Sequence, residues 1–230
     1  MIRGFFVTGT DTGVGKTQAA LGVIEALRQR GFTAAGMKPV ATGCVRGAEG
    51  LRNDDAQRLR AQSSVPLSYE WVNPYAFEPP VSPHIAAAEA GVRIELAHIE
   101  RCFAEIARRA DLVVVEGIGG WMVPLDERHT TADMARVLGL PLILVVGVRL
   151  GCLNHALLTC EHIRARGLPL AAWIANVIDA GCLRIPQITA TLESRLPAPL
   201  LGVIPFLATP GPGAVAAYLA LDRLAVDKTL

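Results

Sequence analysis

Two spacings of apolar residues alternate along the chain. Short continuous apolar runs, such as Leu112-Val113-Val114-Val115, are separated by longer segments in which apolar residues recur every third or fourth position. A strand that is buried on both faces produces the first pattern, and a helix that packs on a sheet produces the second. We therefore predict strands near residues 4–8, 34–38, 111–116, 141–147, 170–176 and 200–204. We predict helices near residues 16–30, 54–62, 83–90, 95–109, 131–138, 154–166, 184–195 and 213–225.

This alternation predicts an α/β fold with a doubly wound, mainly parallel sheet and helices on both faces. No internal repeat, low-complexity segment or linker interrupts it, so residues 1–230 are expected to form a single domain. The stretches 39–53 and 73–83 are expected to be loops over the edge of the sheet. Ligands of such folds bind at the carboxyl ends of the strands, and the candidate chemistry should lie there.

Composition and charge narrow the classes of partner. The formal net charge is +1 and aromatic residues make up 5% of the chain, with no dense basic run, which argues against nucleic acid. Apolar runs such as 140–146 are too short to span a membrane. Because the first predicted strand begins near residue 4, no signal peptide is expected. The five cysteines form no C-x-x-C pair, so free thiols in a cytoplasmic protein are expected.

The segment 9–17, which reads GTDTGVGKT, carries the strongest candidate chemistry. It lies between the first predicted strand and the first predicted helix, where backbone N–H groups can cradle phosphate oxygens. Lys16 is expected to reach the outer phosphates of a nucleotide, and the Thr17 hydroxyl can hold Mg²⁺. The leading glycine, Gly9, is one residue early relative to the strict motif, and Thr10 stands at the usual glycine position. The segment still predicts a P-loop NTPase-like nucleotide site.

Acidic residues at the same edge of the sheet are candidate metal ligands. Glu116 follows the buried run 112–115, as does the carboxylate that holds Mg²⁺ in nucleotide hydrolases. Asp54 and Asp55 begin a predicted helix, and the residues alone do not choose between them as a second ligand. Asn53 or Asp54 could instead cap that helix.

Two further side chains are expected beside the phosphates and the base. Lys38 ends a strand next to the phosphate loop, where an ammonium would stabilise the charge that develops in phosphoryl transfer. The alternative for Lys38 is a surface lysine. Asn176 ends another strand, where its amide could hydrogen-bond an adenine edge, and the alternative is an asparagine in a turn.

A series of segments in order along the chain strongly resembles the dethiobiotin synthetases. They are residues 9–17, 38–43, 50–56, 72–75, 82–84, 115–121, 145–155 and 197–202. The resemblance covers nearly the full chain and implies the penultimate reaction of biotin synthesis. In that reaction 7,8-diaminopelargonic acid, CO₂ and MgATP give dethiobiotin, ADP and phosphate, through a carbamate and a carbamic-phosphoric anhydride.

The resemblance also implies a role for particular residues. The catalytic residues would be Lys38 and Lys16, and the Mg²⁺ ligands would be Thr17, Asp55 and Glu116. The nucleotide would contact Thr12, Gly13, Val14, Gly15, Lys16, Thr17, Glu116, Gly119, Asn176, Pro205, Phe206 and Leu207. The diamine would contact Lys38, Thr42, Gly119, Gly151, Cys152, Leu153 and Asn154.

Members of this family are homodimers, and the resemblance implies that residues 151–154 bind the substrate carboxylate across the interface. The chain departs from the family at Gly13, where a glutamate is common, and over residues 177–184. The main alternative is a partition-type ATPase, whose phosphate loop carries an early signature lysine where this chain has Asp11. A second alternative is another ATP-dependent amidoligase of the same fold.

Overall fold

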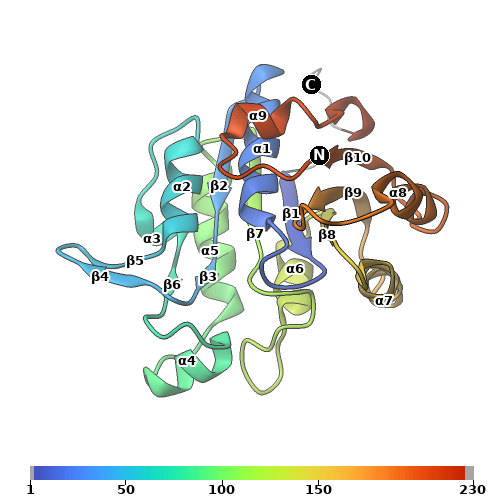
Figure 1. The fold of residues 1–230 in the computed structure, drawn as a ribbon. Coiled ribbons are helices and arrows are strands. Elements are labelled where there is room, and N and C mark those ends of the chain that lie inside the picture. The colour runs from blue at the N-terminus through green and yellow to red at the C-terminus, as the bar shows by residue number, and fades with distance from the viewer. Residues whose placement is uncertain (1–2, 226–230) are drawn as a thin grey trace.

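The computed structural model describes residues 3–225 and is built around one parallel sheet (Figure 1). Its strands lie in the order β10-β9-β8-β1-β7-β2, so β1, the first strand of the chain, is central. Their bounds are β1 Gly4–Gly9, β2 Ala34–Met37, β7 Leu112–Glu116, β8 Leu142–Val148, β9 Leu170–Val177 and β10 Leu200–Ile204. This confirms the expected fold class, a P-loop NTPase-like sheet with helices on both faces.

Helices and short strands connect the sheet strands. The helices are α1 Lys16–Gln29, α2 Asp54–Gln62, α3 Tyr69–Val72, α4 Pro83–Glu89, α5 Leu96–Ala107, α6 Thr131–Leu138, α7 Cys152–Ala165, α8 Ile185–Glu193, α9 Pro212–Ala216 and the 3₁₀ helix η1 Leu221–Arg223. The short strands are β3 Val40–Ala41, β4 Val45–Gly47, β5 Gly50–Arg52 and β6 Tyr75–Ala76. No helix within residues 3–225 is long and apolar enough to cross a membrane.

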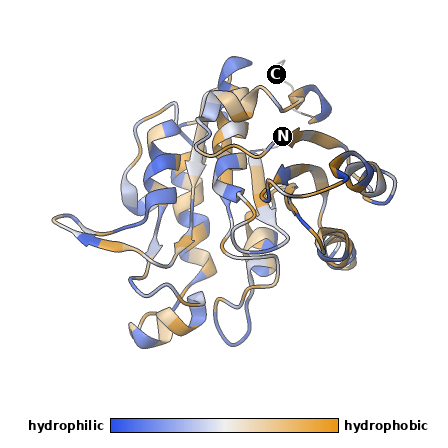
Figure 2. Cartoon of the chain, in the orientation of Figure 1, coloured by the Kyte–Doolittle hydropathy of each residue, from blue (hydrophilic) through white to orange (hydrophobic). Residues whose placement is uncertain are grey.

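Alternate residues of each strand pack on opposite layers of helices. Phe5 and Val7 of β1 belong to the core that α1 and α9 cover, whereas Phe6 faces the core formed with α5 and α6. The same alternation continues in β8, whose Leu144 packs on the α7 and α8 side. Figure 2 shows apolar residues concentrated in the strands and on the sheet-facing sides of the helices. Burial on both faces explains why the strands are apolar without alternation.

Two sequence-based expectations about the elements are wrong. The predicted helix 213–225 is a short α9 followed by η1, because the backbone leaves the helix to pack on β10. The Ala220 amide donates to the Leu201 carbonyl at 2.7 Å, and the Tyr218 carbonyl lies directly against Gly202. The stretches 39–53 and 73–83 are not plain loops, since they contain the β3–β6 pair, the β4–β5 hairpin and the first residue of α4.

Candidate functional site

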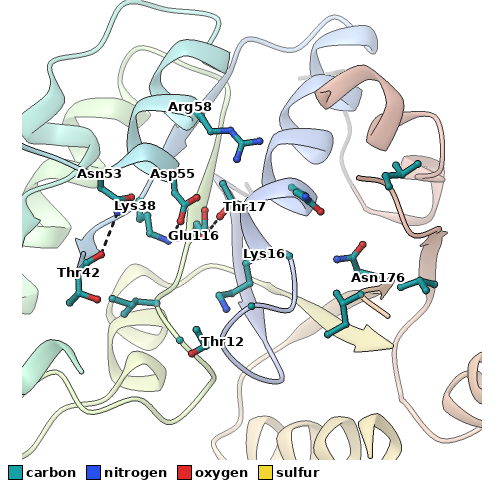
Figure 3. A pocket seen from close by; sticks show the side chains of 18 of the residues that line it. Thr12, Lys16, Thr17, Lys38, Thr42, Asn53, Asp55, Arg58, Glu116 and Asn176 are labelled. Atoms are coloured by element: carbon teal, nitrogen blue, oxygen red, sulfur yellow. Dashed lines mark hydrogen bonds and ion pairs between the residues drawn. The ribbon is translucent and has the colours of Figure 1, made fainter. Parts of the chain in front are cut away.

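A cavity of about 530 Å³ opens at the carboxyl ends of β1, β2, β7 and β9. Parallel strands present their carboxyl ends at one edge of the sheet, so residues far apart in sequence meet there (Figure 3). The predicted site residues that line it are Thr12, Gly13, Gly15, Lys16, Thr17, Lys38, Thr42, Asp55, Glu116, Gly119, Asn176, Phe206 and Leu207. The lining residues that the site prediction did not include are Gln18, Asn53, Arg58, Ile118, Val177 and Ile178.

The phosphate loop joins β1 to α1 and curves around the Lys16 side chain. Gly13 and Gly15 have φ values of 73° and 85°, a left-handed backbone that glycine adopts without steric cost. The Lys16 ammonium donates to the Asp11 carbonyl at 2.8 Å. Burial lowers the pKa of Lys16 to about 8, and the attraction of Glu116 opposes this only in part. The loop therefore holds the Lys16 side chain in place through its own backbone.

A buried ion cluster lies beside this loop. The Lys38 ammonium is 2.6 Å from Glu116 Oε1 and 3.4 Å from Asp55 Oδ2, and the Thr17 hydroxyl donates to Glu116 Oε1 at 2.9 Å. Burial alone would lower the pKa of Lys38, but the two carboxylates outweigh it and raise the pKa above its ordinary value. Lys38 is thus a charged ammonium inside the cavity and not a surface lysine.

The structure separates the two aspartates at the start of α2. Asn53 is the N-cap residue of α2, and its side chain accepts from the Ala56 amide at 3.2 Å. The following turn directs Asp55 into the cavity toward Lys38, whereas the Asp54 side chain is 86% exposed. Of the two aspartates, Asp55 is the one that lines the cavity.

The oxygen atoms of Thr17, Asp55 and Glu116 fit a magnesium ion. Glu116 Oε2 is buried and has no hydrogen-bond partner among the described residues, so one carboxylate oxygen remains for a ligand. Mg²⁺ prefers oxygen ligands and keeps several waters, so a hydroxyl and two carboxylates suffice. This set contains only two carboxylates. A group of three or more His, Cys, Asp or Glu side chains arranged to hold a metal does not occur within residues 3–225.

The far side of the cavity is formed by the end of β9 and by the loop after β10. The Asn176 amide is buried and donates to the Val14 carbonyl at 2.9 Å, which ties β9 to the phosphate loop. Phe206 is half-exposed and lines the cavity together with Leu207. This side offers apolar surface and one amide, which suits a planar heterocycle.

Some predicted site residues do not line this cavity. Val14 is buried beneath the phosphate loop and contributes its carbonyl to Asn176, and Pro205 precedes the lining residues Phe206 and Leu207. Residues 151–154 form the beginning of α7, where Gly151 is the N-cap residue with φ of 94°. These residues do not line the cavity of the chain.

An ion pair that the sequence analysis did not anticipate holds the outer part of the phosphate loop. The Arg149 guanidinium, at the end of β8, is 3.0 Å from the Asp11 carboxylate. The Asp11 carboxylate also accepts from the Thr12 amide at 2.8 Å. Asp11 thus shapes the loop through its side chain, where partition-type ATPases carry a lysine.

A family model and several named relatives each match most of the chain. A family model described as an AAA domain matches residues 3–212. The ATP-dependent dethiobiotin synthetase BioD of Pseudomonas paraeruginosa strain PA7 is 54% identical over 96% of this chain and 98% of its own length. The enzyme of the same name from Cellvibrio japonicus is 49% identical over 96% of this chain and 97% of its own length.

Solved structures with a similar fold have distant sequences. The septum site-determining protein MinD of Pyrococcus horikoshii, complexed with Mg-ADP, has a TM-score of 0.56 at 15% identity, covering 97% of this chain and 89% of its own. The signal recognition particle receptor FtsY of Elizabethkingia anophelis has a TM-score of 0.51 at 13% identity, covering 99% of this chain and 64% of its own. At this identity the likeness extends to the fold alone.

Proposed function

This chain belongs to the ATP-dependent dethiobiotin synthetases, the ligases that make dethiobiotin in biotin biosynthesis, and we propose that the cavity described above is its active site. The observation that carries the proposal is the position of Lys38. Its ammonium is buried between Glu116 and Asp55 in the same cavity as the phosphate loop. A buried cation at this point can stabilise charge on a transferring phosphoryl group.

The lining of the cavity supports one orientation for MgATP in this proposal. The phosphates lie over residues 12–17, where loop N–H groups and Lys16 neutralise their charge. The base would lie beside Asn176, Phe206 and Leu207, and Gly119, in the loop after β7, would face the outer phosphates. Thr17, Asp55 and Glu116 would hold Mg²⁺, which would supply positive charge to neutralise the phosphates.

The diamine side of the site lies around Lys38 and Thr42. CO₂ adds to one amine of 7,8-diaminopelargonic acid to form a carbamate, which Lys38 orients toward the nucleotide. The carbamate oxygen attacks the γ-phosphorus, the bond from that phosphorus to the β–γ bridging oxygen breaks, and ADP leaves. The second amine then attacks the carbonyl carbon, closes the ring and expels phosphate. Lys38 and Lys16 stabilise the negative charge on the transferring group.

We further propose a cytoplasmic homodimer in which α7 contributes to the partner's site. Leu150, Leu158 and Leu183 lie on or next to α7 and α8, which pack against one another, and these leucines are 98%, 63% and 79% exposed. Large exposed leucines on adjoining elements are typical of a protein interface. The N–H groups at the start of α7, residues 151–154, would then bind the carboxylate of the diamine.

The direct test is a product assay. The purified protein is incubated with MgATP, bicarbonate and 7,8-diaminopelargonic acid, while ADP and the mass of the ureido product are followed together. Dethiobiotin formed in step with ADP, and lost when Lys38 is replaced, supports this cavity as the site of the reaction. An ATP turnover rate that does not depend on the diamine would instead indicate a nucleotide-switched ATPase or a ligase with another substrate.

A further inference from the structure

The three cations that line the cavity differ in how they are held. Lys16 donates to the Asp11 carbonyl, and Lys38 is paired with Glu116 and Asp55. The Arg58 side chain is 40% exposed. Its one ion pair within residues 3–225 is with the exposed Asp54, at 4.0 Å. Arg58 is therefore the cation of the cavity that no buried acceptor engages.

The position of Arg58 on α2 explains why it lines the cavity. It follows Asp55 by three residues, and residues three apart lie on the same face of a helix. Figure 3 shows its guanidinium extending from α2 on the side of Asp55 and Thr17, above the ion cluster. The group thus flanks the region where the phosphate loop and the carboxylates meet.

We propose that Arg58 binds phosphate oxygens of the nucleotide from the α2 side of the cavity. This inference rests on the proposal that the cavity holds the nucleotide. The cavity's two lysines and the carboxylates of Asp55 and Glu116 balance in charge, and Arg58 makes their sum positive. A guanidinium also matches two phosphate oxygens at once, which a lysine does not. Arg58 is therefore a nucleotide-binding residue that contributes to the binding of MgATP and MgADP but little to that of AMP.

The test compares nucleotides of different phosphate number by calorimetric titration of the intact protein. Arg58→Ala should weaken binding of MgATP and MgADP by about five- to tenfold, the usual size of a partly exposed charged hydrogen bond. Binding of AMP should change by less than about twofold, and the loss for MgATP should shrink in high salt. The matched control is Arg28→Ala, since Arg28 is a 43% exposed helical arginine that pairs with Glu25 on α1.

Two further variants separate the possible failures. Lys16→Ala should abolish MgATP binding, and unchanged binding would overturn the placement of the nucleotide itself. If Lys16→Ala abolishes binding but Arg58→Ala leaves MgATP affinity unchanged, the cavity stands and the role of Arg58 is wrong. An equal loss for AMP and MgATP also contradicts it, because the contact would then be to the sugar or base. Arg58→Lys should recover part of the affinity, since the charge remains without the planar fork.

Discussion

At the scale of single residues, the site depends on a buried charge pair. Lys38 and Glu116 are both removed from water, so each depends on the other for compensation. Replacing one partner of such a pair leaves a buried charge without a counterion, which is more costly than removing both. The effects of Lys38 on activity and on stability can therefore be separated by comparing a substitution of Lys38 alone with a substitution of both Lys38 and Glu116.

Lys38→Met should lose most turnover and lower the free energy of unfolding by about 3–5 kcal/mol, because Glu116 remains buried and unpaired. Nucleotide affinity should stay within several-fold of wild type, since the phosphate loop is intact. The double variant Lys38→Met with Glu116→Gln should regain part of the stability in urea unfolding but none of the dethiobiotin formation. Near-wild-type turnover in the single variant would remove Lys38 from the mechanism.

Sequence reasoning found most lining residues because a Gly-rich loop, a strand-ending acid and a strand-ending lysine each have a recognisable pattern. The residues alone left Asp54 and Asp55 equivalent, and only the resemblance selected Asp55, since the choice depends on the phase of α2, which the Asn53 cap sets. Sequence reasoning missed Arg58, because an arginine on a predicted helix has the pattern of a solvated surface residue. Only the packing of α2 beside the phosphate loop reveals that this face lines a cavity.

At the scale of elements, the phosphate loop and β9 are fitted to each other. A Cβ atom added to Gly15 would lie 2.1 Å from Asn176 Nδ2, so the loop and the asparagine cannot both keep their places. The φ of 85° at Gly15 adds backbone strain to any larger residue. The absence of a side chain at Gly15 therefore allows the amide of Asn176 to reach the Val14 carbonyl.

Gly15→Ala should weaken MgATP binding by more than about tenfold and lower the unfolding free energy by more than the 1–2 kcal/mol that left-handed strain costs. Gly167→Ala is the matched control, because Gly167 has φ of 67° and no atom within 4 Å of an added Cβ. The Gly167→Ala variant should lose only the unfolding free energy that left-handed strain costs, and its affinity for MgATP should equal that of wild type. Equal effects in the two variants would show that the contact with Asn176 is unimportant.

The turn before α6 provides a pH-dependent contribution to stability. Burial alone would raise the pKa of Asp126, but hydrogen bonds from the His129 ring and from the Arg128 and His129 amides lower it to about 2. A carboxylate with a depressed pKa in the folded state stabilises fully above its unfolded pKa of 3.8 and loses this effect as the pH falls through 2.

Asp126→Asn should therefore lower the Tm at pH 7, and the difference from wild type should shrink below about pH 4 as the wild-type contribution is lost. The measurement is thermal unfolding across this pH range. Glu193→Gln, which removes an exposed carboxylate at the end of α8, is the control and should leave Tm unchanged at pH 7. A Tm difference for Asp126→Asn that is constant with pH would contradict the assignment.

The order and type of the main elements could be predicted because strands buried on both faces produce unmistakable apolar runs. The segment after α9 could not, since its apolar residues have helical spacing but its backbone pairs with the end of β10. The exposed β4–β5 hairpin was also missed, because Val45 is 73% exposed and no buried face creates an alternating pattern. Elements that are stabilised by tertiary contacts or by turn geometry are the hardest to predict, because the spacing of their apolar residues does not reveal them.

At the scale of the whole molecule, the exposed leucines beside α7 and α8 are expected to be covered by a second copy. Leu158→Asp should shift the protein toward the monomer in analytical ultracentrifugation, because a charge would be buried in the interface. It should also reduce turnover, since each site would lose the α7 of its partner. Val45→Asp is the control, as Val45 is similarly exposed on the β4–β5 hairpin. An unchanged sedimentation coefficient for Leu158→Asp would exclude this surface as the interface.

The central position of β1 affects how the chain folds during its synthesis on the ribosome. Both neighbours of β1 are formed by residues more than a hundred positions later, and the Val14–Asn176 contact spans 162 residues. Pairing at such separations is slow, because long loops must close before any contact is gained. The phosphate loop emerges early, but its contact with Asn176 can form only after β9 has been synthesised. Nascent chains that stop before β9 should therefore be unable to retain nucleotide and should be substrates for chaperones.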